Sequence, residues 1–94
     1  MILQFVKLRT DLSEQHLLEI ALDRKPQFEE IPGLLQKYYV KIDNAGRYGG
    51  IYIWDNKESM LAFLDTELAK TIPQAYKVVE APEIELLDIL FQLR

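Results

Sequence analysis

Apolar and polar residues follow one another along this chain in patterns that predict four strands. Residues 2–9 alternate as a strand with one apolar face does. Two apolar and aromatic runs, 33–42 and 48–54, are separated by a polar turn whose Asn and Gly tolerate a positive φ angle. In the last apolar segment, 77–94, Pro82 cannot donate a ladder hydrogen bond. We therefore expect that segment to form an edge strand with a bend at the proline.

Two intervening segments have the apolar spacing of helices. Ser13 can accept hydrogen bonds from the first turn of a helix that should be interrupted at Pro26, restart as a short helix and end at Pro32–Gly33. A second helix is expected to begin after Asp55–Asn56 and to end at Pro73. Its apolar stripe, which is suited to packing on a sheet, consists of Met60, Leu61, Leu64, Leu68 and Ile72.

The predicted order of elements is βαββαβ. This order is typical of the ferredoxin-like α+β class, in which a four-stranded antiparallel sheet carries two helices on one face. The 94 residues contain no internal repeat and no low-complexity linker. We therefore predict a single domain over residues 1–94.

The hairpin formed by residues 33–54 has bulky side chains on both faces, although a strand with one solvated face should alternate apolar and polar residues. The helices of the chain can cover only one of these faces. We expect the other to pack against the sheet of a second subunit, which predicts a homodimer. If Ile42 pairs with Tyr48, one face carries Gln36, Tyr38, Val40, Tyr52 and Trp54, and the other carries Lys37, Tyr39, Ile51 and Ile53.

Composition and charge argue against several classes of function. The formal net charge is −4 and there is no basic block, which disfavours binding to nucleic acid or to an anionic membrane. Cysteine is absent, so disulfides, thiolate metal sites and a cysteine nucleophile are excluded. No run approaches the roughly 20 apolar residues of a membrane span, and the first residues lack the features of a signal peptide. The simplest prediction is a cytoplasmic protein.

Few residues fit standard catalytic or metal-binding constellations. The one histidine, His16, has apolar neighbours four residues away, so we expect it to be solvated and predict no metal site. Ser13 and Ser59 stand at helix starts rather than beside a base. The glycines within 46–50 precede a strand, which favours a bulge or a close backbone contact over a phosphate site. The acidic charge and the run Ile51–Trp54 argue against the RNA-recognition domain, which has the same element order.

The aromatic hairpin is the strongest candidate site. Its rings can serve as core and dimer-interface packing, because aromatic residues dominate such surfaces. They can also line an apolar pocket for a small flat molecule, which the neighbouring polar side chains would orient. The candidate pocket residues are Gln36, Lys37, Tyr38, Tyr39, Tyr52 and Trp54.

Three stretches, 31–37, 49–54 and 55–64, together resemble the YdhR-type monooxygenases of the dimeric α+β barrel superfamily, which also includes the antibiotic-biosynthesis monooxygenases. The resemblance implies a homodimer whose sheets close into a barrel, with a cavity between helices and sheet in each subunit. It also implies an oxidoreductase that oxidises a small aromatic or polycyclic compound with O₂, without metal, flavin or other cofactor. Lys37 or a tyrosine would then stabilise the deprotonated substrate.

The same comparison argues against haem degradation. The haem-degrading relatives carry an Asn on the first strand and a Trp and a His near the second helix. Here residues 2–9 contain no Asn, the only Trp is Trp54 and the only His is His16. Two alternatives to catalysis remain: a non-catalytic homodimer of the same fold that binds a small ligand or is structural, and an assembly module in a larger complex.

Overall fold

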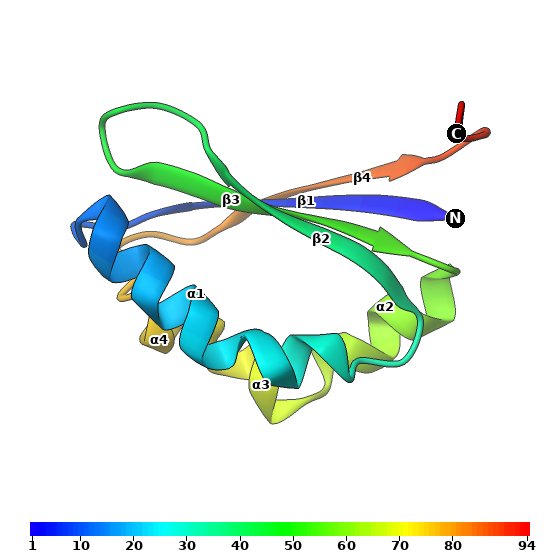
Figure 1. Cartoon of the computed structure of the whole chain (residues 1–94), viewed down its shortest axis with the longest axis horizontal. Helices are drawn as coiled ribbons and strands as arrows, with labels where there is room; N and C mark the ends of the chain where they lie inside the picture. Colours follow the sequence, from blue (N-terminus) through cyan, green and yellow to red (C-terminus); the bar gives the residue numbers. More distant parts are fainter.

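The frame of the structure is a four-stranded antiparallel sheet with helices on one face only (Figure 1). The computed structural model describes residues 1–94. The predicted ferredoxin-like fold and the predicted C-terminal edge strand are both confirmed, and Pro82 lies directly before that strand. The strands are β1 (Ile2–Arg9), β2 (Leu34–Lys41), β3 (Arg47–Trp54) and β4 (Glu83–Asp88), in the spatial order β2-β3-β1-β4.

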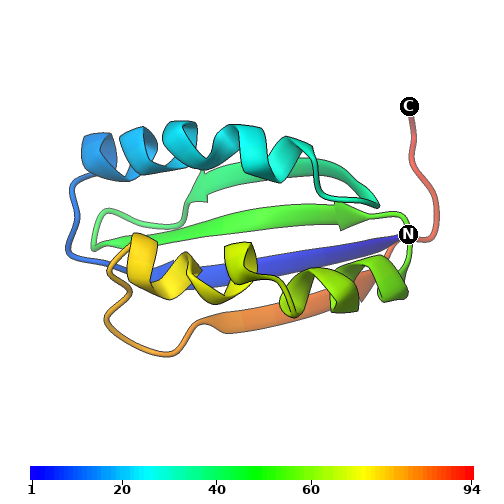
Figure 2. The ribbon, with the colours of Figure 1, turned by 90° about the horizontal axis from the view of Figure 1, so that it is seen from below.

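The helices form two rows on the same face of the sheet (Figure 2). The first row lies along the β2 side and the second along the β1 side. As predicted, the Ser13 and Asn56 side chains cap the first helix of each row by accepting backbone N–H groups. No helix has the length and the apolar character that crossing a membrane requires. The first row is α1 (Glu14–Glu29); the second is α2 (Lys57–Leu64), α3 (Glu67–Lys70) and α4 (Ile72–Ala75).

The expected interruption at Pro26 is wrong, because α1 continues through this residue to Glu29. A proline at this position removes the hydrogen bond to the carbonyl of Leu22. Leu22 is exposed, so water can satisfy that carbonyl. Phe28, in the following turn, is buried against the sheet and holds the end of the helix in place.

The second helical segment was expected to be one helix ending at Pro73, and it is three. Thr66 separates the first two, since its Oγ1 donates to Phe63 O and accepts from Ala69 N. Pro73 lies in the first turn of α4. The N–H groups of a first turn have no partner within the helix, so a proline there costs no hydrogen bond.

The apolar stripe predicted for this segment is correspondingly only partly right. α2 buries Met60 and Phe63, whereas Leu61 and Leu64 are exposed. Leu68 in α3 and Ile72 in α4 pack against the core as predicted. A two-turn helix contacts the sheet through one pair of side chains three residues apart.

The pairing of β2 with β3 differs by one residue from the prediction. Lys41, rather than Ile42, lies opposite Tyr48. The cause is at the turn, where the N–H groups of Ile42 and Asp43 both donate to Arg47 O, so that two residues face one. The Asp43 carboxylate secures this turn by accepting the N–H of Arg47.

This one-residue shift exchanges the faces of the β2 side chains. Lys37 and Tyr39 lie on the helix-covered face, in register with Tyr52 and Gly50. Tyr38 lies opposite Ile51, on the face where Lys37 and Tyr39 were predicted. The predicted face assignment of the β2 residues is therefore reversed.

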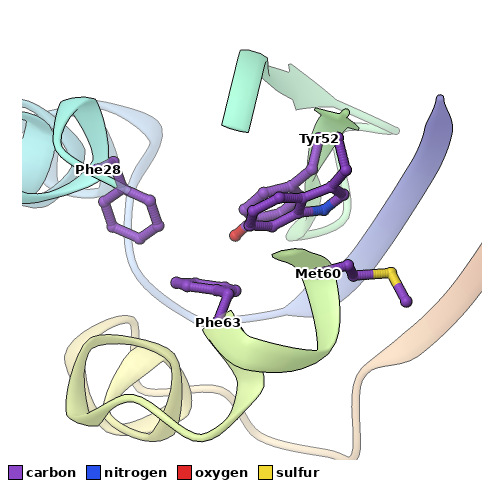
Figure 3. Packing of buried hydrophobic residues seen from close by; sticks show 5 residues of the cluster. Phe28, Tyr52, Met60 and Phe63 are labelled. Atoms are coloured by element: carbon purple, nitrogen blue, oxygen red, sulfur yellow. The ribbon is translucent and has the colours of Figure 1, made fainter. Parts of the chain in front are cut away.

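An aromatic cluster forms the core between the helices and the sheet (Figure 3). Trp54 is fully buried and stacks on Tyr52, with ring centroids 6.0 Å apart and planes 2° from parallel. Phe63 from α2 and Phe28 from α1 complete the ring contacts. The indole N–H of Trp54 donates to Gln4 Oε1 at 2.9 Å, which satisfies both buried polar groups.

The opposite face of the sheet has no covering layer (Figure 1). Large apolar side chains nevertheless lie on it in adjacent cross-strand positions, and two of them, Tyr38 and Leu87, are more than half exposed. The uncovered sheet face consists mainly of Leu3, Phe5, Tyr38, Ile51, Ile53 and Leu87.

Candidate functional site

The Lys37 ammonium group lies among three aromatic rings on the helix-covered side of the sheet. Its Nζ is 3.7 Å from the ring centroid of Phe28, 4.3 Å from that of Tyr39 and 4.5 Å from that of Tyr52. Lys37 forms no salt bridge, unlike Lys7 and Lys41. We call Phe28, Tyr39 and Tyr52 the aromatic cage. The cage attracts a cation through the faces of its rings and contributes no negative charge.

Gly50 makes room for this lysine. It lies on β3 opposite Tyr39, on the face that carries Lys37. A Cβ atom at Gly50 would be 3.1 Å from Lys37 Cε and 3.1 Å from Tyr52 Cε1, tighter than ordinary van der Waals contact. The backbone of Gly50 is thus close to two side chains, and the missing Cβ leaves room for the lysine stem beside β3.

A second cation, Arg24, lies half-buried on the sheet-facing side of α1. Its Nη2 donates to Leu68 O at 2.9 Å and to Thr71 Oγ1 at 3.2 Å, which joins α1 to the second helical row. Its Nε is buried and has no hydrogen-bond partner. The sequence signal for Arg24 is its position on the buried stripe of α1, which also contains Leu17, Ala21 and Phe28.

Burial and neighbouring charge shift the pKa values of this cluster. Burial, and then the Arg24 cation, lower the pKa of Lys37 to about 7. Burial is also the main reason that the pKa of Tyr39 rises to about 12 and that the pKa values of Tyr52 and Tyr76 rise. At neutral pH the cluster therefore holds neutral phenols around an amine present in both protonation states.

Two spaces adjoin the cluster. An inner cavity of about 30 Å³ lies between Lys37, Tyr52 and the buried Tyr76, whose hydroxyl has no hydrogen-bond partner. It is large enough for one water molecule and too small for an aromatic compound. A groove of about 530 Å³, the α1–β2 groove, opens on the other side of Lys37. Its lining is Leu22, Lys25, Phe28, Glu29, Leu34, Leu35, Gln36, Lys37 and Tyr39.

A cleft of similar volume, about 560 Å³, lies between the end of α1 and α2. Its polar lining includes Gln27, Glu30 and Glu58, and it contains no lysine or arginine. The α1–β2 groove instead ends at Lys37, whose pKa is lowered to about 7 by burial and by the Arg24 cation. Perturbed titratable groups concentrate at functional sites, so the α1–β2 groove is the better candidate.

The six candidate pocket residues are divided by the fold. Lys37, Tyr39 and Gln36 line the α1–β2 groove, and Tyr52 adjoins it through Lys37. Trp54 is enclosed in the core and Tyr38 lies on the uncovered sheet face. Arg24, Phe28 and Tyr76 are neighbours of the site that the sequence reasoning did not select.

These features place the chain in a structural class. Its four-stranded antiparallel sheet with helices on one face matches structures of antibiotic biosynthesis monooxygenases. No protein-family model and no curated protein matches the sequence.

The similar structures share the fold at low sequence identity. A protein named "putative antibiotic biosynthesis monooxygenase" from Deinococcus radiodurans is 15% identical, with all of this chain and 97% of that one covered and a TM-score of 0.76. A protein of the same description from Caulobacter crescentus is 20% identical, with 96% and 90% covered and a TM-score of 0.72. SnoaB from Streptomyces nogalater, a cofactor-independent oxygenase, is 13% identical, with 98% and 95% covered and a TM-score of 0.76.

Proposed function

We propose that the protein is a cytoplasmic, cofactor-independent monooxygenase of the YdhR type that acts on a small aromatic compound in the α1–β2 groove. The observation that carries the proposal is the unpaired Lys37 ammonium at the inner end of a groove lined by rings. A buried cation without a counter-ion favours a ligand that brings a negative charge. A phenolate or enolate has both that charge and a flat apolar body.

The proposed reaction begins with transfer of a proton from a phenol or enol of the substrate to solvent water. Lys37 stabilises the resulting anion, which donates electrons directly to O₂. One oxygen atom enters the substrate, where a CH₂ group becomes C=O, and the other leaves as water. The balance is therefore CH₂ + O₂ → C=O + H₂O, and the substrate itself is the reductant. A fixed cation beside aromatic rings supports this chemistry because it stabilises the developing anion.

We further propose that two copies pack through the uncovered sheet face to form a dimeric α+β barrel. The apolar side chains Phe5, Ile51 and Tyr38 form a continuous cross-strand row on that face. An apolar patch of this kind is typical of an interface between subunits. Dimerisation would leave the α1–β2 groove on the helix side of each subunit.

Oxygen uptake tests the enzymatic proposal. The protein is mixed with a panel of polyphenols and quinols, and O₂ consumption is measured with an oxygen electrode. Lys37→Ala should lower the rate by about 100-fold or more, as removing a single stabilising group for an oxyanion does. Tyr52→Phe keeps the ring and removes only its hydroxyl, so it separates the effect of packing from that of the phenol.

The same panel distinguishes the non-catalytic alternative. Compounds that bind, as measured by calorimetry, without any O₂ uptake would overturn the monooxygenase proposal and favour a ligand-binding dimer. Loss of uptake in Lys25→Ala as well as in Lys37→Ala would show that groove charge in general, rather than the caged amine, is responsible.

A further inference from the structure

We propose that Lys37 is a nucleophilic lysine whose amine condenses with the carbonyl group of an aromatic aldehyde or ketone in the α1–β2 groove. The product is an imine. This inference concerns covalent binding and does not depend on the oxygen chemistry proposed above. It rests on the placement of one amine among three rings, beside a second cation and at the end of a groove.

The first requirement for such a lysine is an amine without a stabilising carboxylate. Lys37 forms no salt bridge, and its Nζ faces Phe28, Tyr39 and Tyr52 within 4.5 Å. Two lysines elsewhere on the sheet, Lys7 and Lys41, are paired with glutamates. The ammonium form of Lys37 therefore lacks the counter-ion that Lys7 and Lys41 have.

The second requirement is a group that disfavours the protonated form. The groups facing Lys37 from the packed elements include Arg24, Lys25 and Glu29 on α1. The others are the phenols of Tyr39 on β2, Tyr52 on β3 and Tyr76 after α4. Arg24 is fixed by its bonds to Leu68 O and Thr71 Oγ1, so it cannot turn away from the lysine. Arg24 carries a charge of the same sign on a half-buried side chain, and it lowers the pKa of Lys37 after the burial of the lysine itself.

The third requirement is access. Lys37 lines both the inner cavity of about 30 Å³ and the α1–β2 groove of about 530 Å³. A flat aromatic carbonyl compound fits the groove and not the cavity. Gly50 keeps the path of the lysine stem open, because a side chain there would meet Lys37 Cε. The amine thus stands at the floor of an open site, where a carbonyl carbon can reach it.

The bond changes balance without an added oxidant or reductant. The lone pair of the neutral amine forms a bond to the carbonyl carbon, and the carbonyl oxygen takes a proton to give a carbinolamine. Loss of this hydroxyl with the remaining amine proton releases water and leaves C=N. The overall change is R–CHO + H₂N–Lys37 → R–CH=N–Lys37 + H₂O. The neutral phenols of Tyr39 and Tyr52 adjoin the amine and can donate hydrogen bonds to the departing oxygen.

Reductive trapping tests the proposal on the intact protein. Benzaldehyde is the probe, sodium cyanoborohydride reduces each imine to a stable benzylamine, and peptide mapping by mass spectrometry compares the rate at each lysine. At pH 7 a lysine with a pKa near 7 has about 1,000 times more free amine than one near 10.4, although lower basicity also reduces nucleophilicity, as it does for thiols. We expect Lys37 to be labelled on the order of tenfold faster than the other lysines. These are Lys7, Lys25, Lys41, Lys57, Lys70 and Lys77.

Lys25 is the matched internal control, because it lines the same groove and is exposed outside the cage. The ratio of labelling at Lys37 to labelling at Lys25 should fall between pH 7 and pH 9. With a pKa of about 7, Lys37 is half deprotonated at pH 7 and can gain only about twofold in free amine, whereas an ordinary lysine gains about 100-fold over this range. A ratio near one at pH 7, or a ratio that does not change with pH, would overturn the proposal. This measurement uses the unaltered protein and needs no variant to fold.

Two variants test Arg24 as the positioning residue. Arg24→Gln removes the cation and should lower the Lys37 to Lys25 ratio at pH 7 several-fold, whereas Arg24→Lys should restore it. Circular dichroism shows whether each variant is folded. An unchanged ratio in folded Arg24→Gln would overturn the role of Arg24. Because the assay requires no O₂ uptake, its failure is distinguishable from failure of the monooxygenase proposal.

Discussion

Lys37 and Tyr52 lie directly opposite each other on β2 and β3, with the lysine Nζ 4.5 Å from the centroid of the tyrosine ring. A lysine in a cross-strand position usually extends to solvent. Here α1 covers that face, so Phe28 closes over the ammonium from above. The pair therefore places a charge inside the protein without an opposite charge, which has consequences for stability as well as for chemistry.

Replacing Lys37 by an apolar side chain of similar length should stabilise the protein. The lysine pKa of about 7 means that the folded state disfavours the charged form. At about 1.4 kcal/mol per pKa unit, the fall from 10.5 corresponds to roughly 4–5 kcal/mol at pH 7. The ring contacts offset part of this cost. Lys37→Met should raise the free energy of unfolding at pH 7 by about 2–4 kcal/mol, measured by urea titration. The control, Lys25→Met, should change it by less than about 0.5 kcal/mol; equal effects would contradict the prediction.

The same group makes stability depend on pH. The pKa of Lys37 is lowered to about 7 in the folded state, so between pH 7 and 10.5 the unfolded state binds more protons and stability rises with pH. Tyr39, Tyr52 and Tyr76 have raised pKa values, so above about pH 10 the unfolded state loses protons first and stability falls. The free energy of unfolding should therefore pass through a maximum near pH 10.

Urea titrations at one-unit intervals from pH 6 to pH 11 would show this maximum. Lys37→Met should remove the rise between pH 7 and pH 10 and retain the fall above it. If the stability of the wild type decreases steadily from pH 7 upward, the pKa of Lys37 is not lowered by burial in the folded state.

The two neighbouring glycines of β3 should behave differently when each is replaced by alanine. Gly50→Ala introduces a Cβ 3.1 Å from Lys37 Cε, so the lysine stem must move away from the cage. Gly49→Ala instead meets Phe5 on the uncovered face and the carbonyl of Val6. Both should destabilise by about 1–3 kcal/mol through crowding. Only Gly50→Ala should raise the pKa of Lys37, measured by NMR after ¹³C-methylation of the lysines; a matching rise in Gly49→Ala would contradict this.

The sequence predicted the fold well because its strands and caps are specified locally. The alternation over β1, the cap residues Ser13 and Asn56, and Pro82 before the edge strand each act within a few residues. The errors arose where tertiary contacts decide the outcome. Pro26 is tolerated because Leu22 faces solvent and Phe28 is held in the core, and neither condition can be read from the local pattern.

The face on which each hairpin side chain lies could not be predicted from the sequence. The turn at Ile42–Asp43 places two residues opposite Arg47 and reverses the faces of β2, so the six candidate residues are divided between the groove, the core and the uncovered sheet face. A strand that is bulky on both faces carries no internal signal for its register. Arg24 was missed because a charged residue on a helix is ordinarily solvated, and only its place on the buried stripe of α1 distinguishes it.

The hydrogen bond between Trp54 and Gln4 should contribute measurably to stability. Both residues are buried, and Gln4 Oε1 accepts the indole N–H at 2.9 Å. Gln4→Leu would leave that N–H without a partner and should cost about 1–3 kcal/mol. Trp54 is the single tryptophan, so its fluorescence reports the unfolding transition directly. A variant as stable as the wild type would mean that water replaces the glutamine, whereas the solvent-facing control Gln15→Leu should be neutral.

Dimerisation should depend on the uncovered sheet face. Ile51 lies between Phe5 and Tyr38 in the middle of this face, so a charge there would have to be buried between two sheets. Ile51→Lys should weaken association by about 100-fold or more, because burying an unpaired charge costs about 3 kcal/mol. Analytical ultracentrifugation at micromolar concentration should then give 11.0 kDa for the variant and twice that mass for the wild type. Leu61→Lys is the matched control, because Leu61 is an exposed apolar residue on the helix side. If the wild type sediments as a monomer, or if both variants dissociate alike, the two sheets do not form the proposed interface.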